Sequence, residues 1–286
     1  MRPALLKRQP PEPNAVLDQA TELRRLVREA APAVFGRGCA RPRLVAVAGG
    51  AGGIGTTTLA VNLAVALAQA GRRTILADAS PSGRDAAVLC GLDRQRGAID
   101  RPIGESNLAD LIQPGPGGLR ILAKSEVNET PWRSLPIADC LLDHLATLSS
   151  MADWVVVDAG NSPGRQSRRL WRAADAILLV ATPELTSVMN AYAAVKSLAP
   201  PDAPPEVFSV VSRASAAAAA EEIHARLAQA CRRFLGIRLR HAGYVPAAIE
   251  IEEAGRRGEP FILASPGSLA SRQILAISRR IASNET

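Results

Sequence analysis

The feature that most constrains the fold is an alternation of short apolar runs with helical runs, which begins at residue 43. The apolar runs have the length of strands and carry almost no polar residues; they occupy 44–48, 74–78, 119–123, 154–158, 176–181, 207–212 and 241–245. Strands that are apolar throughout are typical of a sheet covered on both faces. The alternation therefore predicts an α/β fold with a doubly wound, mostly parallel sheet and helices on both faces.

The helical runs predict which side chains are buried. A helix is expected near 216–235, with one apolar stripe formed by Ile223, Leu227, Cys231 and Phe234. The last helix is expected to pack on the sheet through Ile274, Leu275, Ile277 and Ile281. The histidines are scattered along the chain and predict neither a metal cluster nor a catalytic triad; they are His144, His224 and His241.

The N-terminal segment differs from the rest of the chain. We expect disorder over the Pro-rich residues 1–13, a helix over 14–31 that Asn14 caps, a linker over 32–42, and one folded domain over 43–286. The formal charge of the chain is +7, and residues 1–43 carry nine basic and four acidic side chains. This balance favours an acidic partner, either a membrane surface, a nucleic acid or a protein, unless it serves only solubility.

Composition and segment lengths exclude several classes of protein. No run approaches the length of a membrane-spanning helix, and the N-terminus lacks the apolar run of a secretory signal. The four cysteines are far apart and form no CxxC pair, which is typical of reduced thiols in the cytosol. Aromatic residues make up only 3% of the chain, so a stacking platform for nucleic acid is not expected.

A glycine-rich loop follows the first predicted strand and precedes a predicted helix. Backbone N–H groups in such a loop can approach phosphate oxygens, and the helix N-terminus adds positive potential. Thr57, at the first helical turn, offers a hydroxyl for Mg²⁺. The predicted nucleotide-binding residues are Gly50, Gly52, Gly53, Ile54, Gly55, Thr56, Thr57 and Thr58.

Residues 51–58, AGGIGTTT, resemble the deviant P-loop KGGxGKT of the MinD/ParA class of ATPases, and Asn62-Leu63-Ala64 resemble the helix that follows it. Both lysines of that motif are missing, because Ala51 and Thr56 stand at their positions.

Other positions of the motif can be matched one by one. The resemblance assigns Mg²⁺ to Thr57, Asp78 and Asp158, and makes Asp78 the one candidate for a catalytic role. Ser80 replaces a second carboxylate that the family places near the attacking water, and Arg213 stands in the adenine-reading segment without its usual Asn.

The missing lysines predict a weak or inactive ATPase. A charge-assisted hydrogen bond contributes about 1.5–3 kcal/mol, so two lost lysines correspond to about 3–6 kcal/mol of triphosphate binding. ATP and Mg²⁺ are therefore expected to bind weakly or not at all. Two other interpretations remain open: an arginine such as Arg165 or Arg213 replaces the lysines, or the loop is a relic that only packs.

The C-terminal half resembles one branch of the class, the flagellar-number regulators FlhG, FleN and YlxH. The resemblance covers ATPELTSVMNAYAAVKSL at 181–198, FLGIRLRHAGYVP at 234–246 and PFILASPGSLASRQI at 260–274. Residues 18–24 also resemble the DQAxxLR helix with which that branch stimulates an SRP-type flagellar GTPase. The implied partner-binding residues are Asp18, Gln19, Leu23 and Arg24.

These observations predict a cytoplasmic regulator of flagellar placement or number that acts by protein contact on an SRP-type GTPase or on basal-body proteins. Three alternatives stay open: an active switch that dimerises on ATP, a positioning protein for pili or secretion, and a ParA-like DNA binder, although nucleic acid is the least expected partner. Arg272, Arg279 and Arg280 could face anionic lipid, so peripheral attachment to the inner membrane is a further expectation.

Overall fold

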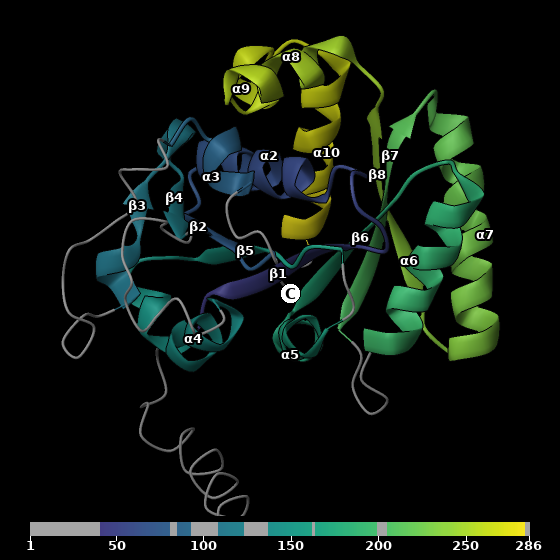
Figure 1. Ribbon diagram of the computed structural model, residues 1–286, viewed down its shortest axis with the longest axis horizontal. Coiled ribbons are helices and arrows are strands. Elements are labelled where there is room, and N and C mark those ends of the chain that lie inside the picture. Colours follow the sequence, from purple (N-terminus) through teal and green to yellow (C-terminus); the bar gives the residue numbers. More distant parts are fainter. Residues whose placement is uncertain are drawn as a thin grey trace, which may run out of the picture. The chain divides into compact units, whose positions relative to one another are not determined.

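The strands of the described part form one sheet in the order β3-β4-β2-β5-β1-β6-β7-β8 (Figure 1). Neighbouring strands run parallel except β3 and β4, which are antiparallel. The strands are β1 Arg43–Gly49, β2 Thr74–Asp78, β3 Gln113–Pro114, β4 Arg120–Leu122, β5 Trp154–Asp158, β6 Ala176–Ala181, β7 Glu206–Ala214 and β8 Leu239–Pro246. This computed structural model describes residues 41–80, 85–92, 108–122, 137–161, 164–198 and 205–283.

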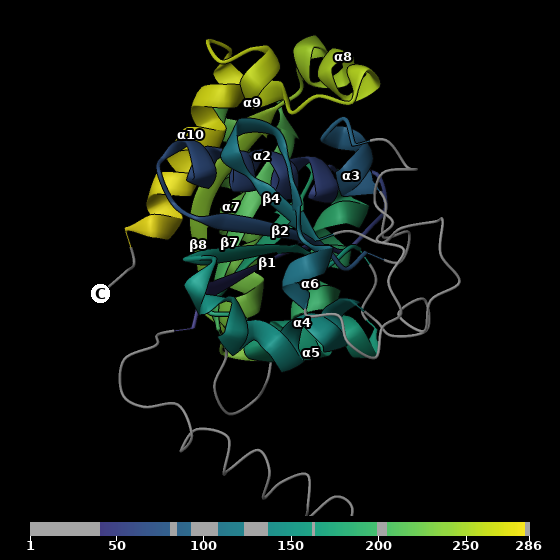
Figure 2. The ribbon, with the colours of Figure 1, turned by 90° about the vertical axis from the view of Figure 1, so that its left-hand side faces the viewer.

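Helices cover both faces of the sheet (Figure 2). They are α2 Thr56–Gln69, α3 Asp85–Leu89, α4 Ile137–His144, α5 Arg165–Ala173, α6 Leu185–Leu198, α7 Ala217–Leu235, α8 Ile249–Arg257, α9 Phe261–Ala264 and α10 Leu269–Ala282. Short 3-10 helices lie at Leu108–Leu111, Pro116–Gly118 and Leu145–Ser150. None of the described helices is long and apolar enough to cross a bilayer.

The core is divided by the sheet into two layers, as the apolar strands require. Along β1, Val45 and Val47 belong to one core cluster with residues of α2 and α10, whereas Leu44 and Ala46 belong to a second cluster with residues of α4, α5, α6 and α7 on the opposite face. Both sets are fully buried. Because successive side chains of a strand point to opposite faces, a strand that is apolar at every position needs cover on both sides. The doubly wound α/β fold is confirmed.

The structure confirms every predicted strand and corrects one detail of the sequence analysis. Phe234 is 66% exposed, so its assignment to the buried stripe of α7 is wrong. The buried residues Ile223, Leu227 and Cys231 recur every fourth position, and this spacing continues to Leu235, which packs on the core instead. The histidines are far apart in sequence, as stated above, but the rings of His224 and His241 stack with centroids 4.8 Å apart, a pairing that the sequence analysis did not predict.

Three further predictions concern the last helix, the edge of the sheet and the N-terminal segment. In α10, Ile274, Ile277 and Ile281 are buried and Leu275 packs against the same core cluster, as expected. β3 is a two-residue strand that the sequence analysis did not anticipate. Residues 1–40 form a separate unit outside the described residues, and the predicted disordered segment, the helix over 14–31 and most of the linker lie there.

Candidate functional site

The glycine-rich loop connects β1 to α2 at the carboxyl end of the parallel strands. Gly53 and Gly55 have φ of 72° and 92°, and Gly55 is the residue before α2. No side chain caps this end of α2, and its first turn holds no acidic residue. The first amides of a helix have no intrahelical acceptor. Within the described residues, these amides are therefore available to an anion.

Gly50 fixes the loop against α6. A Cβ atom at Gly50 would lie 2.3–2.6 Å from backbone atoms of Asn190 and Ala191. Real Cβ atoms essentially never approach other atoms that closely. At Gly52 the same atom would meet nothing within 4 Å. Only a residue without a side chain can therefore occupy position 50, whereas Gly52 faces open space.

Thr56, which stands at the position of a phosphate-binding lysine, is turned into the protein. Its side chain is 2% exposed, and its hydroxyl donates a 2.5 Å hydrogen bond to Oδ1 of Asn161. Asn161 lies just beyond β5, the strand that ends at Asp158. The hydroxyl group thus has an internal partner. The Thr56 side chain is therefore held by Asn161 and does not point into open space.

Thr57 lies beside Asp158. The Thr57 hydroxyl donates a 2.5 Å hydrogen bond to Oδ2 of Asp158, and the backbone N–H of Gly160 donates to Oδ1 at 3.0 Å. Burial raises the pKa of Asp158 to about 6, although the hydrogen bond from Thr57 lowers it. A buried carboxylate with a raised pKa is stabilised by a nearby cation. A hydroxyl and a carboxylate in contact are also ligands that Mg²⁺ accepts.

Asp78 neighbours Asp158, because β2 and β5 pair these two residues in register. Its Oδ1 accepts from the backbone N–H and the hydroxyl of Ser80, and its Oδ2 accepts from the backbone N–H of Ala86. Burial raises the pKa of Asp78 despite these hydrogen bonds. Oδ1 thus holds the turn after β2 and Oδ2 holds the start of α3, which is a structural task in addition to the predicted catalytic and metal-binding roles.

Arg213 reaches the loop from the end of β7. It is the one non-glycine residue with positive φ in the described part of the chain, at 58°, and its Nη2 donates a 2.6 Å hydrogen bond to the carbonyl oxygen of Gly53. Residues other than Gly, Asn and Asp rarely adopt this conformation, which costs about 1 kcal/mol or more. The strain places a guanidinium group at a loop that has no lysine of its own.

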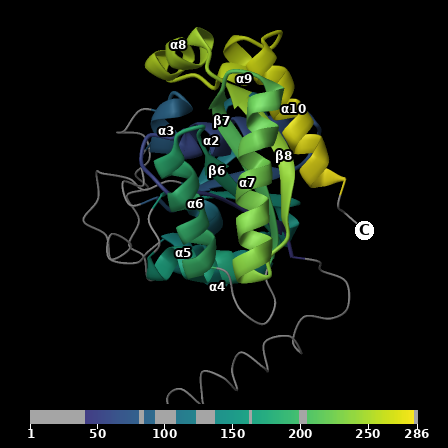
Figure 3. The ribbon, with the colours of Figure 1, turned by 90° about the vertical axis from the view of Figure 1, so that its right-hand side faces the viewer.

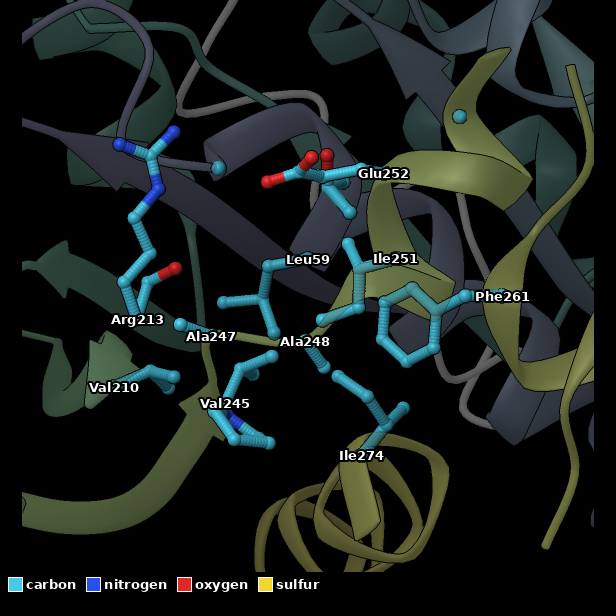
Figure 4. Close-up of a pocket in the computed structure, with 15 residues that line it drawn as sticks. Leu59, Val210, Arg213, Val245, Ala247, Ala248, Ile251, Glu252, Phe261 and Ile274 are labelled. Carbon is cyan, nitrogen blue, oxygen red and sulfur yellow. The ribbon is translucent and has the colours of Figure 1, made fainter. Parts of the chain in front are cut away.

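A cavity of about 280 Å³ lies between Arg213 and α8. Figure 4 shows its floor, where Leu59, Ile251 and Phe261 approach one another, and Glu252 and Arg213 above it. Gly55 and Thr58 of the loop and the first turn of α2 also line it. An apolar floor with a few polar groups beside an anion-binding loop can hold a flat, partly polar group such as a nucleobase.

The remaining predicted residues do not meet at this loop. Arg165 begins α5 and is exposed, and no hydrogen bond joins it to the described loop residues. Asp18, Gln19, Leu23 and Arg24 lie outside the described residues. The nearest cation that the structure brings to the loop is therefore Arg213, one of the two arginines considered from the sequence.

Sequence reasoning gave no contact to three residues that hold the site: it named Asn62 only as part of a motif and did not name Asn161 or Asn190. Asn161 bonds Thr56, and Asn190 sets the approach of α6 to Gly50. Asn62 is 2% exposed, and its Oδ1 accepts from the backbone N–H of Ile262, so that it connects α2 to α9. A buried Asn inside an apolar helix was a visible signal, because a buried amide needs hydrogen-bond partners. The other two depend on contacts distant in sequence.

These features define a P-loop type of nucleotide-binding domain: a parallel sheet with a glycine-rich loop after its first strand, a hydroxyl at the next helix, and an aspartate at the end of the adjacent strand. Residues 45–261 match the family model of the CobQ/CobB/MinD/ParA nucleotide binding domain. The chain belongs to this family.

Relatives place the chain more closely. It is 31% identical over 240 residues to the antiactivator FleN of Pseudomonas aeruginosa, which covers 84% of this chain and 86% of FleN. It is 27% identical to the flagellum site-determining protein YlxH of Helicobacter pylori, over 63% of this chain and 61% of that protein.

Solved structures show the same fold. MinD of Pyrococcus horikoshii, complexed with Mg-ADP, matches 84% of this chain and 96% of its own with a TM-score of 0.64 at 16% identity. The MinC:MinD complex of Aquifex aeolicus matches 85% of this chain with a TM-score of 0.63 at 22% identity.

Proposed function

We propose that this protein regulates the placement or number of flagella, acts by contact with a partner protein on the cytoplasmic side of the membrane, and has weak or lost ATPase activity. The similarity to FleN and YlxH supports the flagellar context. The chemistry of the loop supports the loss of activity. Peripheral attachment to the membrane face, through the arginines of α10, is part of the same proposal.

The observation that carries the proposal is the hydrogen bond between Thr56 and Asn161. A lysine lost by simple drift would leave a gap or an unpaired polar group. Here the replacement is buried, and its hydroxyl is satisfied at 2.5 Å. The polar group at position 56 therefore has its hydrogen-bond partner without a cation there. Phosphoryl transfer depends mainly on positive charge placed around the transferring group, so a loop built this way lacks most of its catalytic power.

The site retains parts that fit a nucleotide. Thr57 and Asp158 would hold Mg²⁺, the amides at the start of α2 would hold phosphate oxygens, and the cavity lined by Leu59, Ile251 and Phe261 would hold the base. Bound Mg²⁺ would supply charge neutralisation to the phosphates. Arg213 would add one cation from the side. This set supports weak binding better than hydrolysis.

A titration with ATP, with and without Mg²⁺, tests the proposal. We expect weak binding, and the double variant Ala51→Lys/Thr56→Lys should tighten it by about two to four decades, because two charge-assisted hydrogen bonds return. Asp158→Ala is the control for a Mg²⁺-dependent signal. Wild-type hydrolysis at the rate of an active MinD, abolished by Thr57→Ala, would show that the proposal is wrong.

The second part of the proposal concerns the N-terminal segment. By the resemblance of residues 18–24 to DQAxxLR, we propose that Gln19 acts near the active site of an SRP-type flagellar GTPase and that Leu23 and Arg24 hold the helix in place. The test adds the full chain to that GTPase and measures GTP hydrolysis. Gln19→Ala should remove the stimulation and keep binding, whereas Leu23→Asp should weaken binding itself.

One observation favours a second candidate, an active ATP-dependent dimerising switch. The guanidinium of Arg213 is held at the loop by its bond to Gly53, so an arginine is present where the lysines are absent. This candidate predicts that a non-hydrolysable ATP analogue doubles the mass measured by light scattering. It also predicts that Arg213→Ala prevents this change. An unchanged mass would reject it.

A further inference from the structure

A second charged surface lies at the opposite end of the sheet from the glycine-rich loop. α7 ends at Leu235, Gly236 follows with a φ of 68°, and β8 begins at Leu239. Figure 3 shows α7 running along β8. Between the end of α7 and the start of β8 is a groove of about 600 Å³, which is lined by Ala228, Gln229, Arg232, Arg233, Arg238 and Leu239. We call these six residues the α7–β8 groove; Phe234 does not line it but lies beside Arg233 at the end of α7.

Among the residues that the structure describes, the arginines of the groove have no anionic partner. Arg232, Arg233 and Arg238 are exposed, and no ion pair within the described residues involves them. The structure treats neighbouring arginines differently: Glu206 accepts an ion pair from Arg240 at 2.7 Å and lies 3.8 Å from Arg43. The arginines of β1 and β8 are thus close to an acidic partner, whereas no described acidic residue pairs with those of the groove.

An exposed aromatic residue accompanies the arginines. Phe234 is 66% exposed, and the guanidinium carbon of Arg233 lies 5.4 Å from its ring centroid. A large apolar side chain at this exposure contributes little to folding. Arginine and aromatic residues together, without lysine, are the composition that is enriched in the centres of protein–protein interfaces.

We propose that the α7–β8 groove binds an acidic protein segment that also carries an apolar side chain. The three arginines would pair with carboxylates, and Phe234 would pack against the apolar side chain. Ala228 is half-buried and Leu239 is buried, whereas the three arginines are exposed, so the groove combines cations with apolar surface. A polypeptide that carries carboxylates and an apolar side chain matches both features. A nucleic acid that is bound only through its phosphates would leave the exposed ring of Phe234 without an apolar contact.

The experiment uses the full chain and a fluorescent peptide at physiological salt, where weak surface attraction is screened. The probe is a twelve-residue peptide in which every third residue is leucine and the others are glutamate. A second peptide has serine in place of leucine. Fluorescence anisotropy gives the dissociation constants, and unfolding curves establish that each variant remains folded.

We expect Arg232→Gln/Arg233→Gln/Arg238→Gln to weaken binding of the leucine peptide about tenfold or more, since exposed ion pairs contribute about twofold to fivefold each. Arg168→Gln/Arg172→Gln/Arg256→Gln removes the same charge from other exposed positions and should change binding less than twofold. Phe234→Ser should weaken binding of the leucine peptide but not of the serine peptide. That difference separates the ring contact from general charge.

Three results would overturn the proposal. The first is equal loss of peptide binding in the two triple variants, which would mean general electrostatic attraction. The second is an unchanged dissociation constant when the groove arginines are replaced. The third is tighter binding of duplex DNA, or of vesicles with anionic phosphatidylglycerol, that depends on the same arginines; the surface would then serve a different class of partner.

Discussion

The chemistry of the site is decided by two threonines that are adjacent in sequence and face different partners. Thr56 donates to Asn161, whereas Thr57 donates to Asp158. The first bond gives the buried Thr56 hydroxyl an internal partner. The second keeps a hydroxyl and a carboxylate in contact beside the loop. Under the proposed function, a change at Thr56 would therefore affect phosphate binding separately from the Mg²⁺ ligands.

The first prediction concerns the bond between Thr56 and Asn161. Asn161→Ala should lower the free energy of unfolding by about 1–3 kcal/mol, because it leaves a buried hydroxyl without its partner. The measurement is urea denaturation. Thr56→Val is the matched variant, because it removes the donor of the same hydrogen bond. If the two single variants and the double variant gave strictly additive losses, the two side chains would not be coupled, contrary to our expectation.

The second prediction concerns Asp158. The pKa of Asp158 is about 6 in the folded protein, whereas the ordinary pKa of an aspartate is 3.8. Between these pH values the folded state therefore holds a proton that the unfolded state has released. Its contribution to stability is therefore present below about pH 4 and is lost as pH rises through 6. The measurement is the free energy of unfolding of Asp158→Asn minus that of the wild type. This difference should increase by roughly 2–3 kcal/mol from pH 4 to pH 7, because only the wild type loses stability as Asp158 ionises.

A control with the opposite sign is available in the same chain. Asp153 is partly exposed, and its hydrogen bond with Arg73 lowers its pKa. Whatever stability this contact adds is present at neutral pH and is lost as pH falls through the folded pKa. The difference between Asp153→Asn and the wild type should thus change in the opposite direction. If the Asp158→Asn difference did not vary with pH, the raised pKa would be refuted.

At the scale of elements, the sequence alone predicted most of the architecture and only part of the site. All seven strand predictions hold, since a sheet buried on both faces leaves a nearly continuous apolar run that few other structures produce. β3 has two residues and only one sheet neighbour, so it leaves no such run. Thr57 and Asp158 were found because the motif places each at the end of an element. Asn161 and Asn190 were missed because their contacts depend on how elements pack.

Phe234 was predicted to be buried, and this prediction failed because it also depended on how elements pack. Both position 234 and position 235 are compatible with a helical stripe that starts at Ile223, so spacing does not choose between them. The choice is made where α7 passes the edge of the sheet, and Leu235 packs there. A pattern within one helix predicts a face, but the neighbouring strand decides where that face ends.

The third prediction concerns the contact between the loop and α6. Gly50→Ala should lower the free energy of unfolding by about 1–3 kcal/mol, since the added Cβ must displace the backbone at Asn190. Gly52→Ala is the matched control in the same loop, because nothing lies within 4 Å of its Cβ position. We expect this control to change stability by less than about 0.5 kcal/mol. Equal losses in thermal unfolding would show that the loop, not α6, sets the requirement.

At the scale of the whole molecule, the chain divides into unequal parts. The two large core clusters are built from residues between Leu44 and Ala282, so the described domain has a complete core of its own. Residues 1–40 form a separate unit that carries the proposed GTPase-stimulating helix. Such an arrangement allows the partner segment and the nucleotide-binding fold to change independently.

The fourth prediction follows from this division. A chain that begins at Arg41 should unfold within about 0.5 kcal/mol of the full chain and should bind nucleotide with the same affinity, because both properties belong to the described domain. It should fail to stimulate the SRP-type GTPase. The full chain with Gln19→Ala is the control, since it keeps every other residue and should fail in the same assay. A truncated chain that still stimulates hydrolysis would place the partner contact on the folded domain, and the α7–β8 groove would then be the first surface to test by substitution.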